Sequence, residues 1–249
     1  MDAAVLREDM IDGLVHESKA VLEDEALTVA MGAVPRHEFV PEGAAYADRD
    51  HEHLGTRVLA PSTVARLLEA LSASPGDSTL IVGSGVGYTA AVLAELVGET
   101  NVHAVDIARP IVYEARTMLE RAGYGGVLVD CRDGAAGLPS YAPFDRILLE
   151  AATVSPPRAL LEQLRDDGVI VFPRITASGT QRLEAHTQAG TLETFGAVSF
   201  EPLLVDGEQV GTLERNRMAR EDGEYTTRRA QSRTGWERDW IEWEGVSSR

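Results

Sequence analysis

The feature that most restricts the fold is an apolar run that breaks at three glycines. Residues 78–82 are apolar and partly β-branched, Gly83, Gly85 and Gly87 follow at alternate positions, and residues 90–94 resume an apolar pattern with helical spacing. This order is typical of a strand, a tight turn and the start of a helix. Glycines permit a sharp turn and the close approach of a ligand, and a helix N-terminus offers backbone N–H groups. The stretch therefore predicts a nucleotide site in an α/β fold.

The spacing of these glycines argues against a dinucleotide. That fingerprint needs a glycine at position 88, where the chain has Tyr88. A second apolar segment, residues 101–105, ends at Asp106, at about the distance where an acid usually binds ribose hydroxyls. Together the two features favour an adenosine-type ligand. The alternative is a glycine turn that only lets a helix pack on a strand.

Charge and cysteine content exclude several classes of partner. The formal net charge of −17 argues against a general nucleic-acid or anionic-membrane partner, because both need a positive surface. Cys131 is the only cysteine, which excludes an internal disulfide and predicts a reducing cytoplasm. We find no signal peptide and no apolar run long enough to span a bilayer.

The balance of basic residues suggests a salt-rich environment. Lys19 is the only lysine, and acid-rich, lysine-poor sequences suit high salt, where screening reduces self-repulsion. We hypothesise a halophilic source, and full stability in dilute buffer would contradict it. A GC-rich genome that prefers arginine codons is the alternative.

Strands that alternate with helices predict a Rossmann-like α/β domain, with a mostly parallel sheet and helices on both faces. We expect three parts: an N-terminal helical, substrate-side segment at residues 1–74, the nucleotide-binding domain at residues 75–210, and a linker with a helical tail at residues 211–249. Expected strands lie at residues 78–82, 101–105, 127–129, 144–149 and 168–172, followed by antiparallel strands at 182–187 and 195–200. Expected helices lie at residues 2–32, 62–71 with Ser62 as N-cap, 110–121 and 157–164. Two prolines predict extended backbone over residues 34–41.

The predicted tail carries three tryptophans at helical spacing, Trp236, Trp240 and Trp243. Side chains of this size must be buried. We expect them to dock on this protein's own body, or alternatively on a partner or second subunit.

Four blocks of the sequence resemble the protein-L-isoaspartate (D-aspartate) O-methyltransferase family. They are Val34–Pro41, Ala45-Tyr46-x-Asp48, Gly83–Ala94 and Asp133–Ile147, in the order that the family keeps. The resemblance implies an S-adenosylmethionine-dependent methyltransferase that acts on the α-carboxylate of L-isoaspartyl, and on D-aspartyl, residues of damaged proteins. Collapse of the ester to a succinimide then allows repair.

The resemblance also implies the cofactor contacts. Asp106 would bind the ribose, and Asp133 would bind the adenine amino group, with Gly134 leaving room. The methionine end would lie at the bend formed by Gly83, Ser84, Gly85, Gly87 and Tyr88. The alternative for Asp133 is an Asx-type turn without a ligand.

The chain departs from the family pattern at two positions. Leu59 stands where the family has a serine at the acceptor carboxylate, and Ile81 stands where it has an acid near the cofactor's amino group. Arg57 could clamp the acceptor carboxylate instead, with Thr56 or Ser62 offering a hydroxyl. The alternatives are a methyltransferase with a different acceptor, and a cofactor- or partner-binding module without catalysis.

A short acidic stretch has some metal-ligand character. His51 and His53 alternate with Asp48, Asp50 and Glu52, but no matching second pair of ligands is evident. We therefore predict a solvated loop and no metal.

Overall fold

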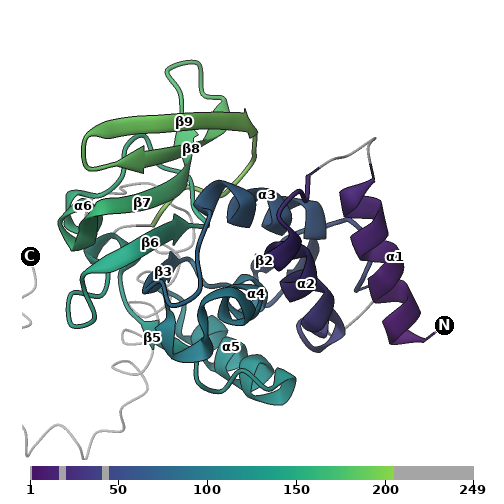
Figure 1. The fold of residues 1–249 in the computed structure, drawn as a ribbon. Helices are drawn as coiled ribbons and strands as arrows, with labels where there is room; N and C mark the ends of the chain where they lie inside the picture. The colour runs from purple at the N-terminus through teal and green to yellow at the C-terminus, as the bar shows by residue number, and fades with distance from the viewer. Residues whose placement is uncertain (1, 17–20, 41–44, 205–249) are drawn as a thin grey trace, which may run out of the picture. The chain divides into compact units, whose positions relative to one another are not determined.

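The computed structural model describes residues 2–16, 21–40 and 45–204, and its centre is a seven-stranded sheet (Figure 1). The strands are β3 (Thr79–Val82), β4 (Val102–Asp106), β5 (Leu128–Cys131), β6 (Phe144–Leu149), β7 (Leu164–Ile175), β8 (Gln181–Thr187) and β9 (Gly190–Ala197). Their spatial order is β5-β4-β3-β6-β7-β8-β9. Neighbours from β5 to β7 pair in parallel, whereas β8 pairs antiparallel with β7 and β9. The predicted mostly parallel sheet with an antiparallel end is confirmed.

The strand order places the expected site. Strand β3 pairs with β4 on one side and with β6 on the other, so the direction in which strands are added reverses at β3. Ligands of open α/β sheets bind at the carboxyl ends of the strands beside such a reversal. The bend after β3 and Asp106 at the end of β4 both lie there.

Helices cover both faces of the sheet. They are α3 (Pro61–Leu71), α4 (Tyr88–Val97), α5 (Arg109–Ala122) and α6 (Arg158–Gln163). Because side chains alternate along a strand, Ile81 packs in the core with residues of α3, α4 and α5, whereas Leu80 and Val82 pack in a second core with Leu160 of α6. All four residues of β3 are buried, which explains why the three that follow Thr79 are all apolar.

Two separate N-terminal helices, α1 (Ala3–Val15) and α2 (Glu25–Ala33), lie beyond α3 and α4 from the sheet (Figure 1). The prediction of one helical region over residues 2–32 is wrong in this respect. Asp24 has extended backbone, and its carboxylate accepts the N–H of Leu27 at 2.8 Å, so a new helix begins there.

Two further local predictions are wrong. Ser62 is not the N-cap of α3: Ala60 occupies that position, and Pro61 fills the first turn, where no N–H is needed. Residues 36–38 form a 3₁₀ helix, η1 (Arg36–Glu38), rather than extended backbone, because Pro35 lies just before the turn and accepts the Glu38 N–H.

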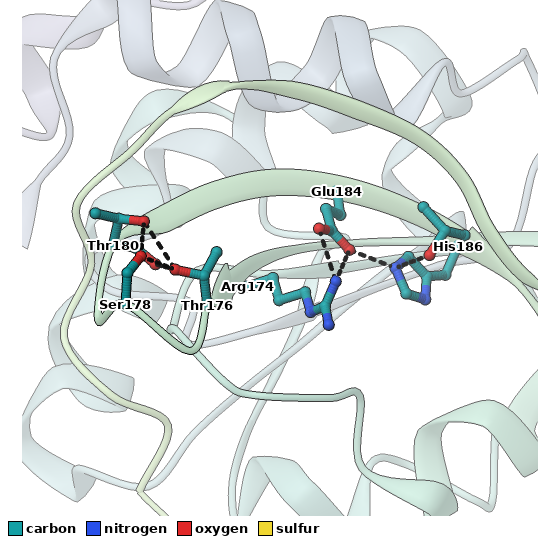
Figure 2. Close-up of polar contacts among 7 residues, drawn as sticks. Arg174, Thr176, Ser178, Thr180, Glu184 and His186 are labelled. Atoms are coloured by element: carbon teal, nitrogen blue, oxygen red, sulfur yellow. Dashed lines mark hydrogen bonds and ion pairs between the residues drawn. The ribbon is translucent and has the colours of Figure 1, made fainter.

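A buried carboxylate joins the antiparallel strands (Figure 2). Glu184 of β8 is 4% exposed, its Oε1 lies 3.2 Å from Nη1 of Arg174, and its Oε2 lies 2.7 Å from Nε2 of His186. A hydroxyl cluster of the β7–β8 turn consists of Thr176, Ser178 and Thr180. Since Glu184 has partners on both sides, we assign this network to the stability of the sheet.

In the part of the chain that the structure describes, no helix is long and apolar enough to cross a membrane. The predicted tail, with Trp236, Trp240 and Trp243, lies outside the described residues, as do residues 205–210 of the predicted nucleotide-binding domain.

Candidate functional site

The glycine bend is held by the chain's own hydrogen bonds. Gly83, Gly85 and Gly87 have φ angles of +87°, +49° and +92°, which favour glycine. The N–H groups of Gly83 and Ser84 donate to the carbonyl of Val105 at 2.9 and 3.1 Å. These N–H groups are therefore not free for a ligand, and the bend is already shaped before a ligand arrives.

Asp106, at the end of the neighbouring strand β4, is hydrogen-bonded to the bend. Its Oδ2 accepts the N–H of Gly85 at 3.2 Å, and its Oδ1 accepts the N–H of Ala108 at 2.9 Å. Burial raises the pKa of Asp106 above its usual value, while these N–H groups act in the opposite direction. A carboxylate has about four acceptor positions. With three backbone N–H groups acting on it, from Gly85, Ile107 and Ala108, the carboxylate keeps acceptor capacity for a ribose hydroxyl.

The loop after β5 behaves partly as predicted. Oδ1 of Asp133 accepts the N–H of Ala135 at 2.9 Å, which is the Asx-type turn that we gave as the alternative. A Cβ on Gly134 would collide with Cγ1 of Val82, so this glycine makes room for the core rather than for a ligand.

Tyr88 faces the N-terminal segment. Its ring is 3% exposed, lies 4.4 Å below the guanidinium carbon of Arg36 and meets the edge of Phe39. Because the ring packs against the N-terminal segment, the predicted contact of Tyr88 with the cofactor would have to come from its backbone, in the first turn of α4.

Arg36 connects this ring to the rest of the substrate-side segment. It is 0% exposed, Nε donates to the carbonyl of Ala45, and Nη2 donates to the carbonyl of Leu59, both at 2.7 Å. Burial lowers the pKa of Arg36, and the charges of Asp48 and Asp50 are among the groups that raise it. This side chain thus joins three stretches that are far apart in the sequence.

A hairpin that the sequence did not predict lies over the bend. Strands β1 (His51–His53) and β2 (Thr56–Val58) pair around Leu54 and Gly55, which have φ angles of +50° and +80°. Oγ1 of Thr56 lies 3.7 Å from the place where a Cβ on Gly85 would be. The structure therefore brings Thr56 next to the bend.

Arg57 and Ser62 already form polar contacts within the protein. Nη1 of Arg57 lies 3.0 Å from Oδ2 of Asp50, and Nη2 donates to the carbonyl of Ser199 at 2.8 Å. The N–H of Ser62 donates to Oδ1 of Asp48 at 2.9 Å. An acceptor carboxylate at Arg57 would therefore have to replace Asp50 or share the guanidinium with it.

Sequence reasoning missed Glu150. It follows β6 directly, its N–H donates to the carbonyl of Val82 at 2.8 Å, and Oε1 is a buried atom without a hydrogen-bond partner in the described part of the chain. Burial, chiefly, raises the pKa of Glu150 to about 8. Like Asp106, Glu150 is an acid at the carboxyl end of a strand, so the same signal could have identified Glu150 from the sequence.

The residues present fit a nucleoside with a cationic end. Glycines line the bend, Asp106 offers acceptors for hydroxyls, and Glu150 has an unpartnered acidic oxygen beside them. Among residues 2–16, 21–40 and 45–204, no group of three histidine, cysteine or acidic side chains is arranged to hold a metal. His53 instead lies 3.1 Å from Oε1 of Glu114.

Comparison with known proteins identifies the same family that the four sequence blocks resemble. The family model of protein-L-isoaspartate (D-aspartate) O-methyltransferase matches residues 6–207. A protein-L-isoaspartate O-methyltransferase of Methanosarcina mazei is 41% identical, over 68% of this chain and 70% of that protein. One from Roseiflexus sp. is 38% identical, over 86% of this chain and 98% of that protein.

Solved structures agree. A protein-L-isoaspartate O-methyltransferase superposes with a TM-score of 0.71 at 26% identity, covering 85% of this chain and 69% of that chain. A Plasmodium falciparum protein solved with S-adenosyl-L-homocysteine superposes with a TM-score of 0.70 at 20% identity, over 80% of this chain and 98% of that one, and shows the shared fold. On its sequence blocks, its fold and these matches, the chain belongs to the protein-L-isoaspartate (D-aspartate) O-methyltransferase family.

Proposed function

We propose that the family's reaction, transfer of a methyl group from S-adenosylmethionine to the α-carboxylate of an isoaspartyl residue, takes place between the glycine bend and the β1–β2 hairpin. One observation carries this placement: Thr56 lies directly against Gly85, so an acceptor held by the hairpin meets a ligand held by the bend. Asp106 would bind the ribose hydroxyls, and Asp133 would bind the adenine amino group.

The reaction needs little acid–base chemistry from the protein. An α-carboxylate with a pKa of about 3.5 is ionised at neutral pH and can act as a nucleophile without a general base. When bound, S-adenosylmethionine supplies a methyl group on a positively charged sulfur. The contribution of this chain is to align the two reactants and to exclude water from between them. A catalytic triad is therefore not required.

Arg57 is the residue that we propose binds the acceptor carboxylate. Its guanidinium already holds the carboxylate of Asp50 at 3.0 Å, so its position and charge suit an anion. We expect Arg57→Ala to lower kcat/KM for an isoaspartyl peptide about ten- to hundredfold, chiefly through KM, and to leave cofactor affinity unchanged. Steady-state kinetics and calorimetry measure the two effects.

Arg66→Ala is the matched control for this variant. Arg66 donates to the carbonyl of Ala197 at 2.9 Å, much as Arg57 donates to that of Ser199, but it lies on α3. If both variants retain full transfer to the isoaspartyl peptide, Arg57 does not bind the acceptor.

One experiment tests the function itself. The protein is incubated in high salt with methyl-labelled S-adenosylmethionine and matched isoaspartyl and aspartyl peptides. Base-labile label on the isoaspartyl peptide alone is the expected result. Label on other cellular material would favour a different acceptor, as the Leu59 position suggests, and cofactor binding without transfer would favour a module without catalysis.

The substrates follow from the family: they are proteins and peptides that contain isoaspartyl residues. A cytoplasmic location rests on the single cysteine, Cys131, and stays a prediction. Fractionation of the source cells would test it.

A further inference from the structure

Glu150 lies level with the glycine bend on the neighbouring strand. Strands β3 and β6 pair in parallel, with Ile81 beside Leu148. The chain continues from there to Gly83 on one strand and to Glu150 on the other. A Cβ on Gly83 would lie 3.6 Å from the carbonyl oxygen of Glu150 and 3.7 Å from its Cβ. The side chain of Glu150 therefore begins at the wall of the cofactor site.

Among residues 2–16, 21–40 and 45–204, no cationic side chain is among the groups that act on this acid. The groups that set its ionisation, besides burial, are the hydroxyl of Thr89 on α4, which hydrogen-bonds the carboxyl, and the charge of Asp106 on β4. Asp106 is itself an acid and repels a second negative charge. Oε1 is buried and, among the described residues, has no hydrogen-bond partner. An acid in such a position is costly when ionised unless a ligand supplies the missing positive charge.

The register of β3 and β6 sets the direction of the Glu150 side chain. Ile81 of β3 is 0% exposed and packs in the core beside α4. Leu148, its register partner, packs in the same core, and Glu150 follows two residues later on the same side of β6. The contact with Thr89 confirms that the carboxyl faces α4. The carboxyl of Glu150 therefore lies on the face of the sheet that α4 covers, beside the glycine bend.

We propose that Glu150 binds the α-ammonium group at the methionine end of S-adenosylmethionine. This inference rests on the proposed use of the glycine bend by that end of the cofactor. Glu150 is a binding residue in this role and takes no part in bond making or breaking.

The proposal predicts that Glu150 loses a proton when the ligand binds. Because burial raises the pKa of Glu150 to about 8, the carboxyl is mostly protonated at pH 7 in the free protein. An ammonium group favours the ionised carboxylate and lowers this pKa. Binding at pH 7 is therefore expected to release about one proton from Glu150 to the buffer. Thr89 does not titrate, and Asp106 is expected to meet uncharged hydroxyls of the ribose.

Calorimetry can measure this release directly. The wild-type protein is titrated at pH 7 in high salt with S-adenosylhomocysteine, which keeps the ammonium group, in buffers of different ionisation enthalpy. We expect release of about one proton per ligand. Glu150→Gln should release none and should bind about ten- to hundredfold more weakly, while Glu150→Asp should keep the release with reduced affinity. Glu193→Gln, at an exposed site on β9, should behave like wild type.

A second ligand separates this proposal from the proposed function. 5′-Methylthioadenosine has the nucleoside but no ammonium group, so wild type and Glu150→Gln should bind it equally and without proton release. If Glu150→Gln binds S-adenosylhomocysteine as tightly as wild type and still releases a proton, the proposal is overturned while the cofactor site stands. If the wild-type protein binds neither compound, the proposed function fails and this proposal fails with it.

Discussion

Replacing Arg36 by methionine is expected to lower the free energy of unfolding by about 3 to 5 kcal/mol. The side chain is 0% exposed and donates to the carbonyls of Ala45 and Leu59, both at 2.7 Å. Methionine can fill much of the space, but it leaves both carbonyls without these donors and removes the cation that lies over the ring of Tyr88. Chemical denaturation at fixed salt measures the difference.

Methyl transfer should fall with stability in this variant, because the hydrogen bond from Arg36 to the Leu59 carbonyl fixes the end of the β1–β2 hairpin. Arg66→Met is the control, because Arg66 also donates to a backbone carbonyl but is an exposed contact. Equal unfolding free energies for Arg36→Met and Arg66→Met would contradict the role that we assign to the buried guanidinium.

The second large effect is a dependence of stability on pH that comes from Glu150. In the unfolded chain this carboxyl loses its proton near pH 4.3, whereas burial raises its pKa to about 8 in the folded protein. Between these values the folded state binds more protons than the unfolded state. The contribution of Glu150 to the free energy of unfolding therefore decreases as pH rises through this window, by on the order of 3 to 5 kcal/mol in total.

Glu150→Gln removes this titration. Without a ligand, the variant is expected to be more stable than wild type at pH 8.5 by several kcal/mol and to differ little from it near pH 4.5. Denaturation curves across this range give the comparison, and Glu193→Gln should follow wild type throughout. Parallel curves for wild type and Glu150→Gln would show that the carboxyl does not titrate abnormally.

The sequence was most informative where local chemistry and the global fold agree. The bend of Gly83, Gly85 and Gly87 could be predicted because only glycine favours the positive φ angles found there. Asp106 could be predicted because it is an acid at the end of a largely apolar strand, about twenty residues beyond the glycines. Glu150 carries the same signal after β6, but the family resemblance directed attention to the position of Ile81 instead.

Other features depend on contacts that sequence periodicity does not report. The β1–β2 hairpin is short and charged, and its turn places Leu54 at a φ angle of +50°, where asparagine or glycine is the usual signal. The last strand, β9, runs over residues 190–197 rather than 195–200, because it pairs with β8 directly after a tight turn. The contact of Arg57 with Ser199 could not be foreseen, since the two residues are remote in sequence.

That remoteness has a consequence for how the protein matures. Arg57 and Arg66 are hydrogen-bonded to carbonyls that follow them by 142 and 131 residues. During synthesis on the ribosome, the bend and its acids emerge long before Ala197 and Ser199 do. A chain that stalls after β7 thus already contains the glycine bend, Asp106 and Glu150, whereas the hydrogen bonds of Arg57 and Arg66 can form only once residues 197 and 199 have been made.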